Sequence, residues 1–510
     1  MKARPIRGGG RLRPAIRILF TVALVVSLAA CSDSSSGLES EPSAATVTLL
    51  PLSVTPEIVD IGDAITASAE GLPPGKTVQF AMVSQEGSYE SKIDLGSIEF
   101  LKPSYAEARI PLGQFATTLD GKLSATFEVP ETYGSGTKDI VATIDGEDVA
   151  KGGVYVGRIA SISVTQGPVG TPITIQVKGL GASGFQSTVG LRWDNKYVGF
   201  MSSTTTAGTA TAVIRATGPV GVHYIDLGPA SAAVPYLNPQ QTPRKITIPT
   251  FRFAFNVTAD NGPPPTAIDW PDASRVNLKP AALALSPDWA ATAGKSKVAA
   301  EMSPVSGPIL SEPKLTVTGL DSNSTVDVVW RTVTGSDVSG WSGDDLLLSK
   351  ATAAGDGTAS LTVKVPEGLG GWHTVGILQD GKMVAEAPYF VERSLISANP
   401  QRVKAGEPFT VEIKGVGWTE FDNGVAVLYD NHYVGYACGF GSGGDVTVEL
   451  LATGGPGTHL IELYPMIYNR GFSQRHYWNY EVPQLTYAQD HPGLSMGYKL
   501  PVFRLAITVE

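Results

Sequence analysis

The chain has 510 residues, a formal net charge of −10, and only two cysteines, Cys31 and Cys438. An acidic surface repels phosphate backbones, so the charge excludes nucleic acid as a partner. The 57 glycines and 36 prolines, together with many Thr and Val residues, favour strands and turns over helices.

The amino terminus predicts export. Residues 1–17 carry six basic residues and no acid, and a short apolar run follows at 18–30. The run is too short to span a bilayer, which requires about 20 residues, so it indicates a secretory signal peptide over residues 1–30. Leu28-Ala-Ala-Cys31 resembles the bacterial lipobox. The resemblance implies cleavage before Cys31 and lipidation of its thiol, whereas an ordinary signal peptide with a chance cysteine is the alternative.

The polar segment 31–44 predicts a flexible tether after the lipidated cysteine. Removal of the six basic residues in 1–30 changes the formal charge from −10 to −16. Ser32 does not match the aspartate-type retention signal of inner-membrane lipoproteins. We therefore expect a lipid-anchored envelope protein facing the periplasm or the exterior, in the outer membrane if the cell is Gram-negative.

An internal duplication organises the rest of the chain. Gly170–Gly181 recurs as Gly406–Gly417, and Trp193–Gly199 recurs as Tyr429–Gly435, each at a separation of 236 positions. Preceding segments also correspond, with Arg158 matching Arg393. The repeated unit is therefore a pair of domains. The predicted boundaries are 45–158, 159–258, 282–393 and 394–510, with a Pro-rich linker at 259–281.

Each domain consists of short alternating segments between Gly, Pro, Asn and Asp turns. Thr174–Lys178 and Thr410–Lys414 alternate with a period of two, which predicts strands with one buried face. The motif around Trp193-Asp-Asn, with its repeat at Tyr429, resembles bacterial immunoglobulin-like domains. The resemblance implies an all-β protein of four tandem immunoglobulin-like (IPT-like) β-sandwich domains, arranged as a duplicated two-domain unit after a lipoprotein signal peptide.

No constellation of catalytic or metal-binding residues is present, so we expect no enzyme activity, no metal site and no cofactor. The segment 440–444 lacks the leading glycine of a nucleophile elbow. His223, His373 and His459 occupy one repeated strand position in three domains, which indicates packing or hydrogen-bonding residues rather than a converging zinc site. Calcium between domains remains conceivable from the oxygen-bearing side chains of 321–327.

The candidate binding site is an aromatic insertion in the fourth domain, between Tyr464 and Tyr498. Aromatic rings stack on sugars or anchor protein partners. The alternative is that the insertion folds over its own sandwich and buries its rings. The residues assigned to this site are Tyr468, Phe472, Arg475, His476, Tyr477, Trp478 and Tyr480.

Three functions follow from these patterns. The first is a membrane-anchored lipoprotein in which a rod of sandwiches presents a site for a protein or glycan partner. The second is a purely structural envelope spacer or assembly subunit. The third is an enzyme or accessory module acting on an extracellular polymer, with a carboxylate pair that sequence does not reveal.

Overall fold

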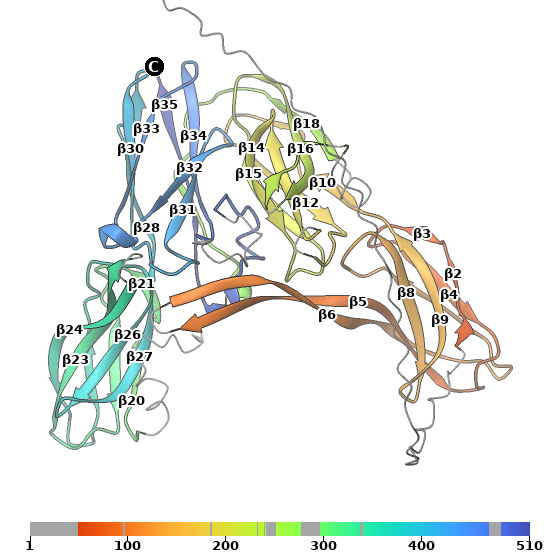
Figure 1. Ribbon diagram of the computed structural model, residues 1–510, viewed down its shortest axis with the longest axis horizontal. Helices are drawn as coiled ribbons and strands as arrows, with labels where there is room; N and C mark the ends of the chain where they lie inside the picture. The colour runs from red at the N-terminus through yellow and green to blue at the C-terminus, as the bar shows by residue number, and fades with distance from the viewer. Residues whose placement is uncertain are drawn as a thin grey trace, which may run out of the picture. The chain divides into compact units, whose positions relative to one another are not determined.

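The computed structural model describes residues 49–510 except 95–96, 184–185, 232, 239, 241–250, 277–295, 337–339 and 469–480. Within these residues the regular structure consists of β-strands and three short 3-10 helices. The strands form four β-sandwiches, numbered 1 to 4 along the chain (Figure 1). The all-β tandem-sandwich fold expected from the sequence is therefore confirmed.

Sandwich 1 pairs the three-stranded sheet β2-β4-β7 with the larger sheet β1-β9-β8-β5-β6, to which β3 is added beside β9. Its strands are β1 (Leu50–Pro51), β2 (Ser53–Thr55), β3 (Ile58–Val59), β4 (Ala64–Ala69), β5 (Thr77–Asp94), β6 (Ser97–Ala116), β7 (Leu123–Glu128), β8 (Gly136–Ile144) and β9 (Glu147–Val156).

Sandwich 2 pairs β10-β12-β15 with β11-β18-β16-β13-β14, and β17 is added beside β16. Its strands are β10 (Ile159–Ile162), β11 (Gln166–Gly167), β12 (Pro172–Lys178), β13 (Thr188–Trp193), β14 (Lys196–Ser202), β15 (Ala210–Arg215), β16 (Gly221–Ser231), β17 (Val234–Pro235) and β18 (Phe251–Val257).

Sandwich 3 pairs β20-β22-β25 with β21-β27-β26-β23-β24. Its strands are β20 (Ala299–Ser303), β21 (Ser306–Pro308), β22 (Lys314–Thr318), β23 (Thr325–Ser336), β24 (Gly340–Thr352), β25 (Ala359–Thr362), β26 (Gly371–Gln379) and β27 (Lys382–Glu392).

Sandwich 4 pairs β28-β30-β33 with β19-β35-β34-β31-β32, and β29 is added beside β35. Its elements, with the preceding helix η1 (Ala273–Arg275), are β19 (Ala267–Asp269), β28 (Ser394–Asn399), β29 (Arg402–Val403), β30 (Pro408–Lys414), β31 (Gly424–Tyr429), β32 (His432–Cys438), η2 (Phe440–Ser442), β33 (Val446–Leu451), β34 (Gly457–Pro465), η3 (Leu494–Met496) and β35 (Val502–Val509).

The strand order is that of an immunoglobulin-like sandwich. In each unit the larger sheet contains the central order of G, F and C strands, as in β18-β16-β13. A short strand pairs in parallel with the last strand, as β11 does with β18. Strand β19 lies inside the stretch predicted as linker and pairs with β35, so this part of the chain is an edge strand of sandwich 4.

The alternation of buried residues in the strands and the conformations of the turns agree with the expectations from the sequence. In β12 the alternate residues Ile173, Ile175 and Val177 are fully buried. Asp194 and Asn195 have φ angles of 48° and 67°, the left-handed values that a two-residue type I′ hairpin turn requires. Asp430 and Asn431 adopt the same conformation in the repeat, with φ angles of 48° and 57°.

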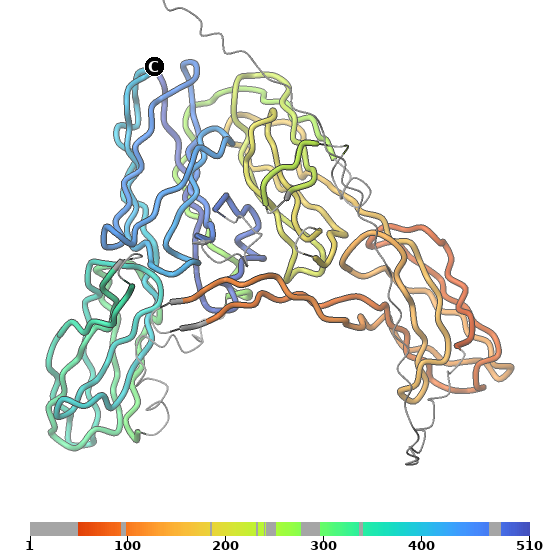
Figure 2. Tube along the Cα trace, viewed as in Figure 1, coloured from red at the N-terminus to blue at the C-terminus, as the bar shows by residue number. Residues whose placement is uncertain are grey.

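Strands β5 and β6 extend far beyond the sandwich to which they belong, as a two-stranded arm (Figures 1 and 2). Strand β8 pairs with β5 only from Gln79 to Met82, whereas the pairing of β5 with β6 continues to Asp94. Near the tip, Phe100 is fully buried in a cluster with Phe200 of sandwich 2, Trp372 of sandwich 3 and Phe421 of sandwich 4.

Sandwiches 2 and 4 share a hydrophobic core although they are not neighbours in sequence, a contact that the expected rod of sandwiches did not include. Leu428, Leu460 and Tyr464 of sandwich 4 belong to the same buried cluster as Ile175 and Ile214 of sandwich 2. The contact forms because the outer face of the sheet containing β31 and β34 is apolar and packs against sandwich 2.

Candidate functional site

The predicted site residues fall mostly outside the described part of the chain. Cys31 and six residues of the aromatic insertion lie outside the described residues. Tyr468 is the one assigned binding residue that the structure describes. The six are Phe472, Arg475, His476, Tyr477, Trp478 and Tyr480.

The described remainder of the insertion is buried rather than presented to solvent. Leu485 and Tyr487 belong to the core shared by sandwiches 2 and 4, and Tyr498 is fully buried with Phe421 and Phe390. Residues 481–500 are therefore mostly buried, in part against sandwich 2 and not only over their own sandwich. Here the insertion serves as the contact between two sandwiches.

This segment also extends a sheet of sandwich 2. The Phe200 N–H donates to the Pro483 carbonyl at 3.0 Å, and the Leu485 N–H donates to the Phe200 carbonyl at 2.9 Å. The bridge between Phe200 and Gln484 is parallel. The Ser202 N–H donates to the Thr486 hydroxyl at 3.1 Å. Residues 483–486 thus cover the free edge of β14 through one parallel β-bridge, centred on Gln484.

Asp490 links the insertion to two other parts of the molecule. Its carboxylate accepts hydrogen bonds from the backbone N–H groups of Thr204 and Thr205, both at 2.8 Å, and from the Thr205 hydroxyl at 2.7 Å. The Tyr89 hydroxyl of the β5–β6 arm donates to the same carboxylate at 3.1 Å. One buried side chain therefore joins sandwiches 2 and 4 and the arm.

Tyr468 belongs to a row of aromatic side chains, the aromatic surface, formed by Trp341, Phe440, Tyr468 and Tyr436. The ring centroids are 6.3 Å apart for Trp341 and Phe440, 6.1 Å for Phe440 and Tyr468, and 5.9 Å for Tyr436 and Tyr468. Tyr436 is 46% exposed. Trp341 comes from β24 of sandwich 3, whereas the other three rings belong to sandwich 4.

A pocket of about 360 Å³ opens at one end of the aromatic surface. Trp330, Trp341 and Leu346 of sandwich 3 line it together with Phe440 of η2, and Glu367 contributes a carboxylate. Trp330 is held rigidly because it is buried and stacks on His373, with ring centroids 4.8 Å apart. The pocket therefore combines preformed aromatic walls with one anionic group, as ligand sites commonly do.

A thiol lies close to this surface without being reactive. Burial, reinforced by the charge of Glu481, raises the pKa of Cys438 to about 11. The thiolate is the nucleophilic form of cysteine, and at neutral pH this thiol stays protonated. The surface therefore offers shape and aromatic area for binding, not an activated cysteine.

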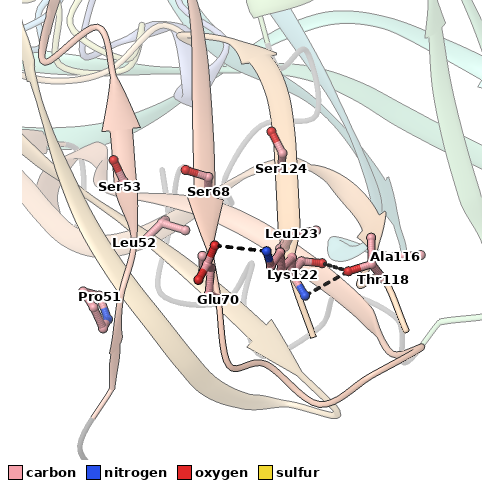
Figure 3. A pocket seen from close by; sticks show the side chains of 11 residues that line it. Pro51, Leu52, Ser53, Ser68, Glu70, Ala116, Thr118, Lys122, Leu123 and Ser124 are labelled. Carbon is pink, nitrogen blue, oxygen red and sulfur yellow. Dashed lines mark hydrogen bonds and ion pairs between the residues drawn. The ribbon is translucent and has the colours of Figure 1, made fainter. Parts of the chain in front are cut away.

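A larger pocket of about 710 Å³ lies in sandwich 1 (Figure 3). It is lined by small and polar residues such as Ser53, Ser68 and Ser124, and no aromatic ring lines it. Its Lys122 and Glu70 form an exposed ion pair at 3.6 Å. This pocket has nothing buried that would orient a ligand, so the smaller aromatic pocket is the stronger candidate.

The three repeated histidines act as hydrogen-bonding residues, as predicted. In His223 the Nδ1 atom lies 2.5 Å from the Asp194 carboxylate, and Nε2 lies 2.7 Å from the Pro219 carbonyl. His459 repeats this arrangement with Asp430. His373 contacts two backbone carbonyls instead. Among residues 49–510 as described, no group of His, Cys, Asp and Glu side chains could hold a metal ion.

The junction of sandwiches 3 and 4 contains an isolated pair of buried charges. The Arg393 Nη2 group donates to the Asp422 backbone carbonyl at 2.6 Å, and the Asp422 carboxylate accepts from the Thr419 N–H at 2.9 Å. Burial raises the pKa of Asp422 to about 6, although Thr419 and Arg393 oppose the change. Burial also lowers the pKa of Arg393 to about 10.

Sequence reasoning missed Trp341 and Phe440. Phe440 stands in a Gly-rich segment that the sequence analysis considered only for a nucleophile elbow. An aromatic residue among glycines and serines, with no alternating strand around it, was the available signal. No sequence pattern links it to Trp341, which lies 99 positions earlier and meets it only because sandwiches 3 and 4 adjoin.

Comparisons with known proteins leave the family open. No protein-family model and no curated protein matches the chain. Among solved structures, a tetra-tandem repeat from the extending region of a large adhesion protein is 12% identical, covering 90% of this chain and 99% of its own, with a TM-score of 0.19. An ectodomain fragment of ICAM-5 is 12% identical, covering 91% and 100%, with a TM-score of 0.18.

The Escherichia coli adhesin FdeC is 12% identical over 67% of this chain and 96% of its own, with a TM-score of 0.14. At such TM-scores these similarities carry no argument about function. The assignment of tandem immunoglobulin-like sandwiches rests on the strand order described above.

Proposed function

We propose that the chain is a lipid-anchored, non-enzymatic protein of the bacterial cell envelope that binds a protein or glycan partner through the aromatic surface of sandwiches 3 and 4. The observation that carries this proposal is the aromatic pocket between β24 and η2, which continues over Tyr468 to Tyr436. Tyrosine and tryptophan supply large contact areas and lose little conformational entropy on binding.

Anchoring rests on the lipobox-like segment that ends at Cys31. In the part of the chain that the structure describes, no helix is long and apolar enough to cross a membrane. A Cys31→Ser variant should move from the membrane pellet to the soluble fraction, as followed by immunoblotting after cell fractionation. Retention of the variant in the pellet would show a second anchor.

Binding is tested with the mature protein and two defined probe sets, an oligosaccharide array and an array of immobilised envelope proteins. Trp341→Ala and Phe440→Ala should each weaken a signal at least tenfold, because each removes one wall of the pocket. Tyr224→Ala is a matched control, since Tyr224 is 50% exposed but lies on sandwich 2. Equal binding by all the variants would refute the assignment of the surface.

A structural role is the second candidate, favoured by the burial of residues 481–500 between sandwiches 2 and 4. A spacer needs a stiff body, and the shared core and the docked arm both stiffen this one. This role predicts that Trp341→Ala and Phe440→Ala leave envelope assembly and localisation unchanged and that neither probe set yields a signal.

A further inference from the structure

Because of the duplication, sandwiches 2 and 4 have the same edge strand in their larger sheets. Among the described residues, a further segment pairs with this edge strand only in sandwich 2. Strand β14 (Lys-Tyr-Val-Gly-Phe-Met-Ser, 196–202) corresponds to β32 (His-Tyr-Val-Gly-Tyr-Ala-Cys, 432–438). Residues 483–486 cover the edge of β14, whereas no described strand pairs with the outer edge of β32.

The equivalent side chains of the two edge strands differ in their exposed fractions. Val198 and Phe200 are both 0% exposed, whereas their counterparts Val434 and Tyr436 are 49% and 46% exposed. The apolar character of the edge is thus retained in sandwich 4, where none of the described residues pairs with it as residues 483–486 pair with β14. An exposed apolar edge strand invites pairing with another extended chain.

The space beside the edge strand is occupied at Gly199 of sandwich 2 and open at the equivalent Gly435 of sandwich 4. A Cβ atom added to Gly199 would lie 2.5 Å from the Pro483 carbonyl oxygen, so the absence of a side chain there admits the added strand. A Cβ atom added to Gly435 would meet nothing within 4 Å. The equivalent glycine is present, and the space beside it is open.

The backbone of β32 is in register to receive a strand. Phe200 pairs with Gly190 in β13, and Tyr436 pairs with the equivalent Ala426 in β31. At Phe200 both the N–H and the carbonyl point outward and bond to residues 483 and 485. The same register directs the N–H and carbonyl of Tyr436 away from β31.

The described residues of sandwich 2 supply no strand beside the outer edge of β32. After β16 its chain turns back at once into β17, which pairs with β16 through Ala230 and Pro235. The corresponding excursion after β34 contains the segment that reaches β14. The duplication therefore became asymmetric, with one edge occupied from within the chain.

We propose that the outer edge of β32 binds an extended peptide segment of a partner protein, added in parallel as residues 483–486 are added to β14. One backbone carbonyl of the peptide accepts from the Tyr436 N–H, and the N–H two residues later donates to the Tyr436 carbonyl. Main-chain pairing of this kind supplies affinity, and alternate side chains supply selectivity. Uncharged, apolar side chains suit the neighbouring Val434, Tyr436 and Tyr468.

This inference rests on the proposed binding function and names the partner class as peptide. The internal strand provides a probe of known sequence, a capped synthetic peptide Val-Pro-Gln-Leu-Thr-Tyr-Ala copied from 482–488. Fluorescence anisotropy with the mature protein should show saturable binding. Hydrogen exchange should show at least tenfold slower exchange in the peptic fragment containing 432–438 when the peptide is bound.

Two controls isolate the main-chain contact. A peptide N-methylated at its leucine keeps every side chain but lacks the N–H that pairs with the Tyr436 carbonyl, so it should bind at least tenfold more weakly. Tyr436→Pro removes the outward N–H without removing a ladder bond to β31 and should have a similar effect. The methylated peptide keeps the test valid if this variant fails to fold.

Three results would overturn the proposal. The first is no binding, the second is equal binding of the N-methylated peptide, and the third is protection of 196–202 instead, which would mean that the probe displaces the internal strand at β14. If the peptide does not bind while Trp341→Ala still weakens binding to an array, the assignment of a peptide site to β32 is wrong and the proposed function stands. If neither peptide binding nor array binding is detected, both the peptide site and the proposed binding function are contradicted.

Discussion

At the scale of single residues, equivalent positions of the two copies can carry side chains of different chemistry. Gln186 in sandwich 2 corresponds to Asp422 in sandwich 4, and the neighbouring arginines Arg158 and Arg393 correspond as well. Arg158 donates to the Gly179 carbonyl at 2.9 Å, with no carboxylate at the position equivalent to Asp422. The second copy therefore has a buried, titratable group between sandwiches 3 and 4 that the first copy lacks.

Asp422 should make the stability of the protein fall as the pH rises from about 4 to about 6. Its pKa is raised in the folded state to about 6, so the folded protein binds a proton in this range that the unfolded chain has released. A shift of about two pKa units corresponds to about 3 kcal/mol. Asp422→Asn should remove this pH dependence, as measured by urea unfolding between pH 4 and 7.

The exposed Asp445 provides the control for this titration, because Asp445→Asn leaves the buried carboxyl in place. Its unfolding midpoints should follow those of the wild type at every pH. An Asp422→Asn variant with the same pH profile as the wild type would show that the buried carboxyl does not titrate in this range.

At the scale of elements, the outer part of the β5–β6 arm depends on the contacts of its tip. A two-stranded ribbon is at best marginally stable in water by itself. Beyond Met82 no third strand among the described residues pairs with the arm, and the Phe100 side chain is fully buried among residues of the other three sandwiches. The Phe100 N–H also donates to the Glu420 carboxylate at 2.7 Å. Docking of the tip therefore holds the outer part of the ribbon, whereas nearer the sandwich Gly87 and Tyr105 contact Tyr133.

Phe100→Ala should release the arm. Removing a buried phenylalanine side chain costs about 3–5 kcal/mol, which exceeds what a lone ribbon can supply. Hydrogen exchange of 90–103 should accelerate strongly, while the inner part of the arm, held by the contacts of Gly87 and Tyr105 with Tyr133, and the core strands of sandwich 1 keep their protection. Glu107→Ala, at an exposed position of the same ribbon, should change nothing. Unaltered exchange in the Phe100→Ala variant would mean that other contacts hold the arm.

At the scale of the whole molecule, a buried ionic network joins sandwiches 2 and 4. Glu462 accepts from Arg215 of sandwich 2 and from Arg504 of its own sandwich, both at 2.7 Å. Burial acts to raise the pKa of Glu462, but the charges of Arg504 and Arg215 hold it below its ordinary value. Glu462 therefore stabilises the fold above about pH 4.5, and this contribution is lost as the pH falls.

Glu462→Gln should destabilise the protein by about 3–5 kcal/mol at neutral pH, because it leaves two buried arginines without their shared carboxylate. The matched control is Asp226→Asn. Asp226 is the equivalent residue of sandwich 2, and its partner Arg252 has a side chain 65% exposed. Thermal unfolding should show a much smaller loss for this control, and equal losses would contradict a special role for the interface.

Much of the fold could be predicted because it depends on local chemistry. Period-two alternation in 174–178 predicted a strand with one buried face, and Asp194-Asn195 predicted a tight turn. These features depend on neighbours a few residues away, so a single sequence contains them. The 236-residue repeat likewise revealed the duplication without any knowledge of contacts.

Only the tertiary structure decided how the sandwiches meet and where the aromatic surface forms. The long arm, the shared core of sandwiches 2 and 4, and the meeting of Trp341 with Phe440 all join residues far apart in sequence. Such contacts depend on the shapes of whole surfaces, which alternation and turn signals do not encode. For the same reason Tyr487, an aromatic residue of the insertion, proved to be core, while Tyr436, in an ordinary strand, proved to be exposed.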